Sequence, residues 1–144
     1  MKVIGTTEIS FEIENILNKA NKQLILVTPY IKLNPRLQAR LSEAFSKVEN
    51  IYIFHRQNEL LAASKEWLSS FSNVRLFPIR NLHAKIYAND SHLIICSMNL
   101  YEYSQINNHE IGVILEKTKD KEAFEDALNE VSLILKTEFP DQSL

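Results

Sequence analysis

The sequence predicts an α/β fold in which a mixed β-sheet is flanked by helices on both faces. In the first half of the chain, segments with the 3.6-residue apolar period of amphipathic helices alternate with short β-prone apolar runs. In the centre, two β-prone runs are separated only by the turn residues Asn89-Asp90-Ser91, which predicts a β-hairpin rather than another helix crossover. Crossovers followed by a hairpin predict a sheet sandwiched between helices.

In the first half, helices and strands are expected to alternate, beginning with a helix. The continuous apolar run 23–28, which Pro29 ends, indicates a buried strand after the first helix. Asn34-Pro35 combines a helix cap with proline at the first helical position, so a second helix is expected there, followed by a strand at 51–54. A third helix is expected across 58–70 and a strand at 74–77. The apolar residues that mark the first two helices are Ile9, Ile13, Ile16, Leu17, Ala20, Leu37, Leu41, Ala44, Phe45 and Val48.

The second half is expected to hold the hairpin, a last strand and a helix. The hairpin arms are 82–88 and 92–96, the last strand is 110–116, and the C-terminal helix begins near Asp120. Because side chains alternate along a strand, His83, Lys85 and Tyr87 are expected on one face of the first arm. An active site needs such a polar face on a central strand.

Length and composition predict one compact domain spanning residues 1–144, located in the cytoplasm. Hydrophobic residues make up 45% and charged residues 24%, which is ordinary globular usage. The longest apolar runs, at 24–27 and 93–95, are too short to span a bilayer, and the N-terminus has no signal-peptide core, so no membrane insertion is expected. The single cysteine, Cys96, suits a reducing compartment. Too few side chains stand at metal-ligand spacing to predict a metal or another cofactor.

One stretch carries most of the functional signal. His83, Lys85 and Asp90 form the pattern His-x-Lys-x-x-x-x-Asp within NLHAKIYAND. Ser97 and Asn99 follow in Cys-Ser-Met-Asn, and an acidic residue, Glu110, precedes the last apolar strand. This constellation resembles the active-site motif of the phospholipase D superfamily, in which Gly-Ser-x-Asn follows the His-Lys-Asp run. Cys96 stands in the place of that family's glycine.

The resemblance implies a role for each residue of the motif. His83 is expected to attack phosphorus and form a phosphohistidine, while Lys85 and Asn99 bind the phosphate oxygens. Glu110 is expected to accept a hydrogen bond from His83 Nδ1, so that Nε2 faces phosphorus, and Ser97 to support it. For Asp90, a hairpin-capping or interface role is expected rather than a catalytic one.

Each of these residues also has a structural interpretation. His83 alone would be a satisfied strand histidine, Asn99 a helix cap and Ser97 a strand-end hydroxyl. Tyr30 and Arg56, which follow or end two of the predicted strands, are candidate cleft residues, and Tyr30 equally suits the core or the surface. Cys96 is either a packing residue or an obstruction to the phosphate.

The motif occurs once, although the mechanism needs one histidine to attack and another to protonate the leaving oxygen. In the family that the motif resembles, short nucleases carry it once and pair two subunits. We therefore expect a homodimer that brings both His83 side chains into one cleft. The alternative is that this chain is part of a longer protein.

The leading functional prediction is a metal-independent phosphodiesterase, a nuclease acting on DNA or RNA. A net charge of −2 gives no general attraction to nucleic acid, so cations must gather locally. The candidates are Lys32, Arg36, Arg40, Arg56, Lys65, Arg75 and Arg80. The alternatives are a phospholipid phosphodiesterase or transphosphatidylase, and a non-catalytic nucleic-acid-binding or assembly module with the same fold.

Overall fold

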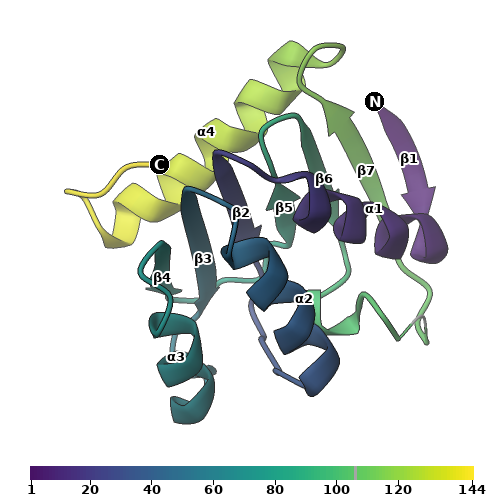
Figure 1. Cartoon of the computed structure of the whole chain (residues 1–144). Helices are drawn as coiled ribbons and strands as arrows, with labels where there is room; N and C mark the ends of the chain where they lie inside the picture. Colours follow the sequence, from purple (N-terminus) through teal and green to yellow (C-terminus); the bar gives the residue numbers. More distant parts are fainter. Residues whose placement is uncertain (106) are drawn as a thin grey trace.

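The structure is a computed structural model that describes residues 1–105 and 107–144, and in it the chain forms a seven-stranded mixed sheet with helices on both faces (Figure 1). This confirms the predicted fold class. In chain order, the elements are β1 (Lys2–Gly5), α1 (Thr6–Lys19), β2 (Gln23–Val27), α2 (Pro35–Phe45), β3 (Asn50–Arg56), α3 (Ala62–Ser69), β4 (Val74–Ile79), β5 (Ile86–Ala88), β6 (His92–Cys96), the 3₁₀ helix η1 (Leu100–Glu102), β7 (Ile111–Glu116) and α4 (Lys121–Glu138).

The sheet has a parallel half and an antiparallel half that meet at β2. The strand order is β1-β7-β6-β5-β2-β3-β4, in which β2 pairs parallel with β3 and β3 pairs parallel with β4. On its other side β2 pairs antiparallel with β5, and β5, β6, β7 and β1 continue antiparallel. The change follows from the connections, because helices α2 and α3 return the chain for parallel pairing, whereas a tight turn joins β5 to β6.

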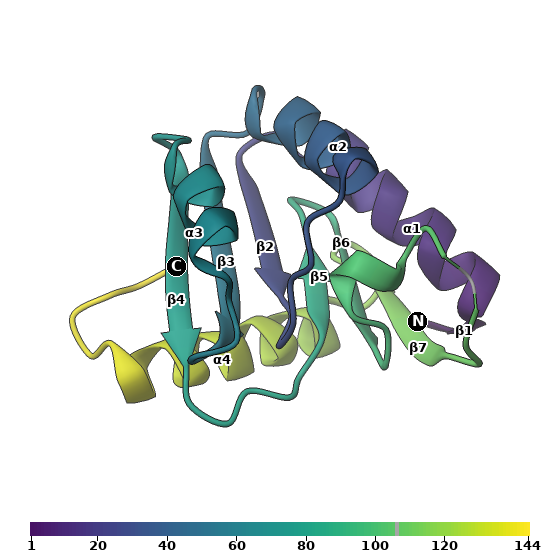
Figure 2. The same cartoon turned by 90° about the horizontal axis from the view of Figure 1, so that it is seen from below.

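Each face of the sheet packs against its own helices. Helices α1, α2 and α3 cover one face, where Leu24, Leu26 and Tyr87 lie in the core, and α4 covers the other. Figure 1 shows the sheet between these two layers, and in Figure 2 α3 lies in front of the strands and α4 behind them. Helix α2 begins as predicted, with Pro35 at its first position and the Asn34 side chain accepting a hydrogen bond from Leu37 N at 2.9 Å.

The predicted site residues other than Asp90 lie at one end of the strands, which is called the site edge below. The carboxyl ends of β2, β3 and β4 lie at this edge, and because β5 runs antiparallel to β2, the start of β5 lies there too. The end of β6 and the start of β7 join them, since Cys96 pairs with Gly112. Figure 2 shows the connection from β4 to β5, which includes residues 80–85, passing the ends of the parallel strands.

The structure departs from the sequence prediction by more than two residues at three places. Strand β1 was not predicted; it is only four residues long, and its pairing partner β7 begins more than 100 residues later. Helix α3 begins at Ala62 instead of 58, because Asn58 adopts a positive φ of 67° in the turn after β3. Strand β5 begins at Ile86, so His83 and Lys85 precede the central strand and do not lie within it.

Candidate active site

His83 and Lys85 lie side by side at the entry to β5. Lys85 Nζ is 3.4 Å from His83 Nε2 and 3.5 Å from Nδ1. The His83 side chain is exposed, whereas Lys85 is only 9% exposed, and its carbonyl accepts a hydrogen bond from Cys96 N at 3.2 Å. An anion held by the Lys85 ammonium would therefore lie within reach of the imidazole.

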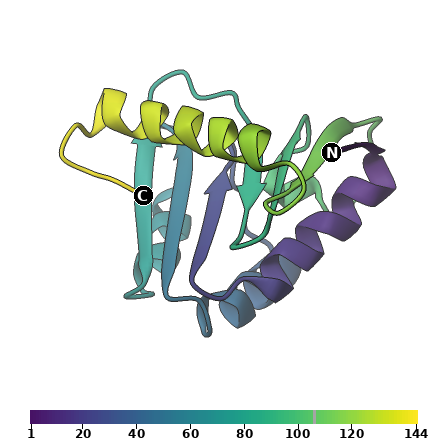
Figure 3. The same ribbon diagram turned by 90° about the horizontal axis from the view of Figure 1, so that it is seen from above.

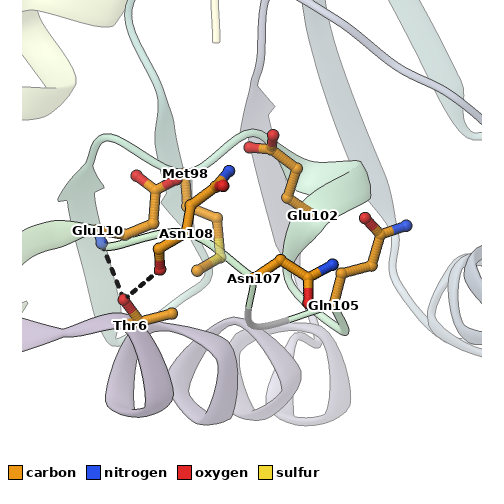
Figure 4. Close-up of a pocket in the computed structure, with 7 residues that line it drawn as sticks. All are labelled: Thr6, Met98, Glu102, Gln105, Asn107, Asn108 and Glu110. Carbon is orange, nitrogen blue, oxygen red and sulfur yellow. Dashed lines mark hydrogen bonds between the residues drawn. The ribbon is translucent and has the colours of Figure 1, made fainter.

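Ser97 and Glu110 form a second hydrogen-bonded group at the same edge. The Ser97 hydroxyl donates to Glu110 Oε2 and accepts from Ile111 N at 3.1 Å. Glu110 N donates to the Thr6 hydroxyl at 2.8 Å, which in turn donates to Asn108 O at 2.9 Å (Figure 4). The first residue of α1 thus fixes the backbone of the predicted orienting carboxylate.

The hydrogen bond predicted between Glu110 and His83 is not made in this structure. Within the described residues, the contact of the His83 ring nitrogens is with Lys85 Nζ, which can donate to whichever nitrogen carries no hydrogen, and the Glu110 carboxylate is bonded to Ser97. The physical reason is that His83 precedes β5 as an exposed residue, while Ser97 and Glu110 are tied to each other across the ends of β6 and β7.

Asn99 stands between β6 and η1, as a helix cap would. Its backbone N and its Nδ2 both donate to Glu102 Oε2, at 3.1 Å and 3.4 Å. The next residue, Leu100, donates its backbone N to the Thr28 hydroxyl at 3.2 Å, which ties η1 to the end of β2. Asn99 is therefore held directly by Glu102 and, through its neighbour Leu100, by Thr28.

Asp90 lies at the opposite end of the hairpin from His83. Its carboxylate accepts hydrogen bonds from the backbone N atoms of Asn21, Lys22 and Gln23, at 2.8–3.2 Å. The turn itself is closed by Asn89, whose Oδ1 accepts from Ser91 N at 2.9 Å. Asp90, for which a hairpin-capping or interface role was expected, thus anchors the connection from α1 to β2, while Asn89 closes the hairpin turn.

Of the two candidate cleft residues, Arg56 has the clearer contact with the site. Arg56 Nη1 donates to the carbonyl oxygen of Leu82, the residue directly before His83, at 3.3 Å, so Arg56 holds the connection that carries the imidazole. Tyr30 is half-buried, and its carbonyl accepts from the Thr28 hydroxyl at 3.2 Å.

Some of the cations expected at the cleft lie at the site, and others make ion pairs or aromatic contacts away from it. Lys32 lies at the site edge, with Nζ 4.9 Å from the ring centroid of Tyr101 in η1. Others are engaged elsewhere: Arg40 with Glu14 at 3.1 Å, Arg80 with Glu138 at 3.1 Å, and Arg75 over the Tyr52 ring at 4.6 Å.

A small polar pocket lies beside the site, between the start of α1 and the segment joining β6 to β7. It is lined by Thr6, Met98, Glu102, Gln105, Asn107, Asn108 and Glu110 (Figure 4). Among the residues that the structure describes, no three His, Cys, Asp or Glu side chains gather closely enough to hold a metal ion. None of the helices described there has the length and apolar composition needed to cross a bilayer.

This arrangement agrees with comparisons to known proteins. A family model described as "Cardiolipin synthase, PLD-like domain" matches residues 13–132, which is most of the chain. The chain belongs to the phospholipase D-like family. No curated protein matches it.

Solved structures of three proteins share the fold. The phospholipase D family member Nuc from Salmonella typhimurium superposes with a TM-score of 0.64 at 18% identity, covering 90% of this chain and 91% of Nuc. NucT from Helicobacter pylori gives 0.70 at 12% identity, covering 94% of each chain. TrmBL2, described as an archaeal chromatin protein with a novel mode of DNA binding, gives 0.62 at 19% identity, covering 90% of this chain and 50% of TrmBL2. At these identities the likeness concerns the fold.

Cys96, which replaces the glycine of the phospholipase D motif, packs as a small apolar residue. Its side chain is partly buried against the core beneath α1 and α2, and Sγ lies 3.6 Å from Met98 O. Burial raises the pKa of the Cys96 thiol to about 11, so it is neutral at physiological pH.

Three residues that hold the motif in place were not predicted from the sequence. Thr6, Thr28 and Glu102 each bond to the segment between β6 and β7. Only Glu102 had a local signal: Asn99-x-x-Glu102 has the spacing of a helix N-cap and the acidic residue that reaches back to it. The two threonines act across more than 70 residues, which no local pattern reveals.

Proposed function

We propose that the chain is a metal-independent phosphodiesterase, and specifically a nuclease acting on DNA or RNA through a phosphohistidine at His83. The observation that carries the proposal is the pair formed by an exposed imidazole and a largely buried ammonium, with Lys85 Nζ 3.4 Å from His83 Nε2. The buried lysine stem fixes the cation, and the exposed imidazole leaves a nitrogen accessible to a phosphodiester.

The reaction follows from general acid–base chemistry. An imidazole nitrogen of His83 attacks phosphorus, and the bond from phosphorus to the leaving oxygen breaks as that oxygen takes a proton from a second imidazole. The second imidazole then removes a proton from water, which attacks the phosphohistidine and releases the phosphate monoester. Lys85 and the Asn99 amide would stabilise the charge that develops on the non-bridging oxygens.

The second imidazole is proposed to be His83 of another copy of the chain, because one imidazole cannot attack and donate at the same time. The exposed position of His83 makes it available to a partner. A two-fold axis beside the site would bring both His83 side chains into one cleft.

An uncovered apolar face next to the site supports this assembly. Ile95 is paired with Val113, and Val113 with Val3, so all three side chains point to the face that α4 covers elsewhere. Yet Ile95 is 40% exposed and Val3 and Ile111 are each 65% exposed. Figure 3 shows α4 crossing β4, β3 and β2, with β1 beyond it. We propose that a second copy of the chain covers this face. The face includes Ile111, the residue directly after Glu110, so it adjoins the site.

Nucleic acid is the substrate that the surroundings of the site favour. Lys32 over the Tyr101 ring combines a cation with an aromatic face, the pairing that binds phosphates and stacks bases along a single strand. Arg36, the second residue of α2, follows Lys32 closely in the sequence, and its side chain is exposed. Because the single cysteine suits a reducing compartment, we place the enzyme in the cytoplasm.

The proposal is tested by incubating the wild type and His83→Ala with plasmid DNA, RNA, bis(p-nitrophenyl) phosphate and phospholipid vesicles in EDTA. The wild type should cleave nucleic acid, and His83→Ala should lose at least about 1,000-fold in rate. His92→Ala, which changes a histidine at the far end of the same hairpin, should keep full activity. Cleavage of vesicles alone would favour the phospholipase alternative, and DNA binding without cleavage would favour the non-catalytic module.

Subunit mixing tests the shared site. Wild type mixed with an excess of His83→Ala should form heterodimers with far less than half the activity of a wild-type dimer. A fully active monomer, or a dimer with the two His83 side chains on opposite outer surfaces, would contradict the shared site.

A further inference from the structure

A single carboxylate oxygen holds Asn99 in two places. Glu102 Oε2 accepts from Asn99 N at 3.1 Å and from Asn99 Nδ2 at 3.4 Å. The backbone bond is the one that an acidic residue in the first turn commonly makes to the residue before a helix. The side-chain bond is additional, and it sets the rotation of the Asn99 amide.

The same contact explains a buried polar atom without a partner. Among side-chain N and O atoms of the described residues, Asn99 Oδ1 is the one that is buried and has no hydrogen bond. Such an atom normally costs stability. Turning the amide over would exchange the two ends but would place Oδ1 near the Glu102 oxygen, where two acceptors repel. The Glu102 carboxylate therefore imposes the orientation.

We propose that Glu102 is a positioning residue that fixes the Asn99 amide for phosphate binding, an inference that rests on the function proposed above. An amide nitrogen carries two hydrogens in a fixed plane. One points to Glu102, and the other remains for a phosphoryl oxygen. Without Glu102 the amide would rotate, and in half of its orientations Oδ1 would face and repel that oxygen.

The surrounding bonds make this positioning effective. Leu100 N donates to the Thr28 hydroxyl at 3.2 Å, and Glu102 N donates to Asn99 O at 3.0 Å, so η1 is anchored to β2 and closed on itself. Glu102 contacts Asn99 and does not touch the phosphodiester. Its effect should therefore appear only when Asn99 is present.

A double-mutant cycle tests this dependence, using kcat and KM for bis(p-nitrophenyl) phosphate with Glu102→Ala, Asn99→Ala and the double variant. Glu102→Ala should lower kcat by about 10-fold or more, because a small displacement of a positioned group costs rate. In the Asn99→Ala background the same change should lower kcat by less than about 2-fold. Glu102→Gln keeps an acceptor oxygen and should restore most of the rate. If Glu102→Ala does not fold, Glu102→Asp, which withdraws the carboxylate by one methylene, takes its place.

Asn34→Ala is the control for loss of a helix cap, because it removes the side-chain oxygen that accepts from Leu37 N at the start of α2. It should lower stability and leave kcat unchanged. Equal losses for Glu102→Ala with and without Asn99, or full activity of Glu102→Ala, would overturn the inference while leaving the proposed function intact. An inactive wild type, or an Asn99→Ala variant with full activity, would overturn the inference together with the function or the Asn99 role on which it rests.

Discussion

Cys96 and Gly112 face each other across β6 and β7, and a Cβ atom built on Gly112 would lie 2.6 Å from Cys96 Cβ. The pair therefore has room for one side chain. In the motif that the sequence resembles, glycine occupies the Cys96 position. Here Gly112 on the neighbouring strand leaves the space that the Cys96 side chain occupies between β6 and β7.

Gly112→Ala should be destabilising. The new Cβ would also lie 2.7 Å from Ile95 O, a backbone atom that cannot move away without shifting β6. We expect the free energy of unfolding in urea to fall by about 1–3 kcal/mol. Gly5→Ala is the control: nothing lies within 4 Å of its Cβ, so its effect should stay within about 0.5 kcal/mol. A Gly112→Ala variant as stable as Gly5→Ala would show that the two strands separate easily.

Asp90→Ala should reduce stability without impairing catalysis. The substitution removes the acceptor for the backbone N atoms of three residues, Asn21 to Gln23. Because these groups lie near the surface and water can replace part of the lost bonding, we expect a loss of about 1–2 kcal/mol in urea denaturation. The folded variant should keep the wild-type kcat, and Asp141→Ala, a change at an exposed C-terminal position, should alter neither quantity. A folded Asp90→Ala protein with kcat reduced as strongly as in His83→Ala would assign Asp90 to the chemistry.

The acidic side of the pH–stability curve should depend on His55. Burial lowers the pKa of His55 below its usual 6.5, and the nearby Lys65 ammonium acts in the same direction. As pH falls below 6.5, the unfolded chain therefore binds a proton that the folded chain resists, and stability decreases. The decrease continues until the pH falls below the lowered pKa of the folded state.

Urea denaturation between about pH 7.5 and about pH 5 measures this effect. His55→Gln should flatten the decrease, whereas His109→Gln, a change at an exposed position, should leave the wild-type slope. A slope unchanged in His55→Gln would mean that other groups carry the acid sensitivity.

The sequence predicts the fold correctly where burial produces a clear apolar pattern, either a continuous apolar run or the apolar face of a helix. Leu24 to Val27 and Ile51 to Phe54 are wholly buried strands, and the helices between them show their apolar faces. Prediction fails where burial is partial. In the predicted third helix, Leu61 and Ala63 are apolar but exposed, because the turn at Asn58 delays the start of α3.

The chemistry of the candidate site could be predicted only as a set of residues, not as a set of contacts. The spacing of His83 and Lys85 correctly implied that they are neighbours, since residues two apart share a face in extended chain. The bond from Glu110 N to Thr6 joins residues 104 positions apart and depends on β1 pairing with β7. Such contacts follow from the assembled sheet and leave no local pattern.

The most direct test of the central claim is to trap the covalent intermediate on His83. Wild type reacting with bis(p-nitrophenyl) phosphate in EDTA is quenched rapidly in alkali, digested with trypsin and analysed by mass spectrometry. The tryptic peptide 81–85 contains His83 as its single histidine. It should carry a p-nitrophenylphosphoryl group in the wild type and in His92→Ala, and none in His83→Ala. Turnover without an adduct on this peptide under rapid quench, an adduct on another residue, or activity that requires a divalent ion would contradict the account.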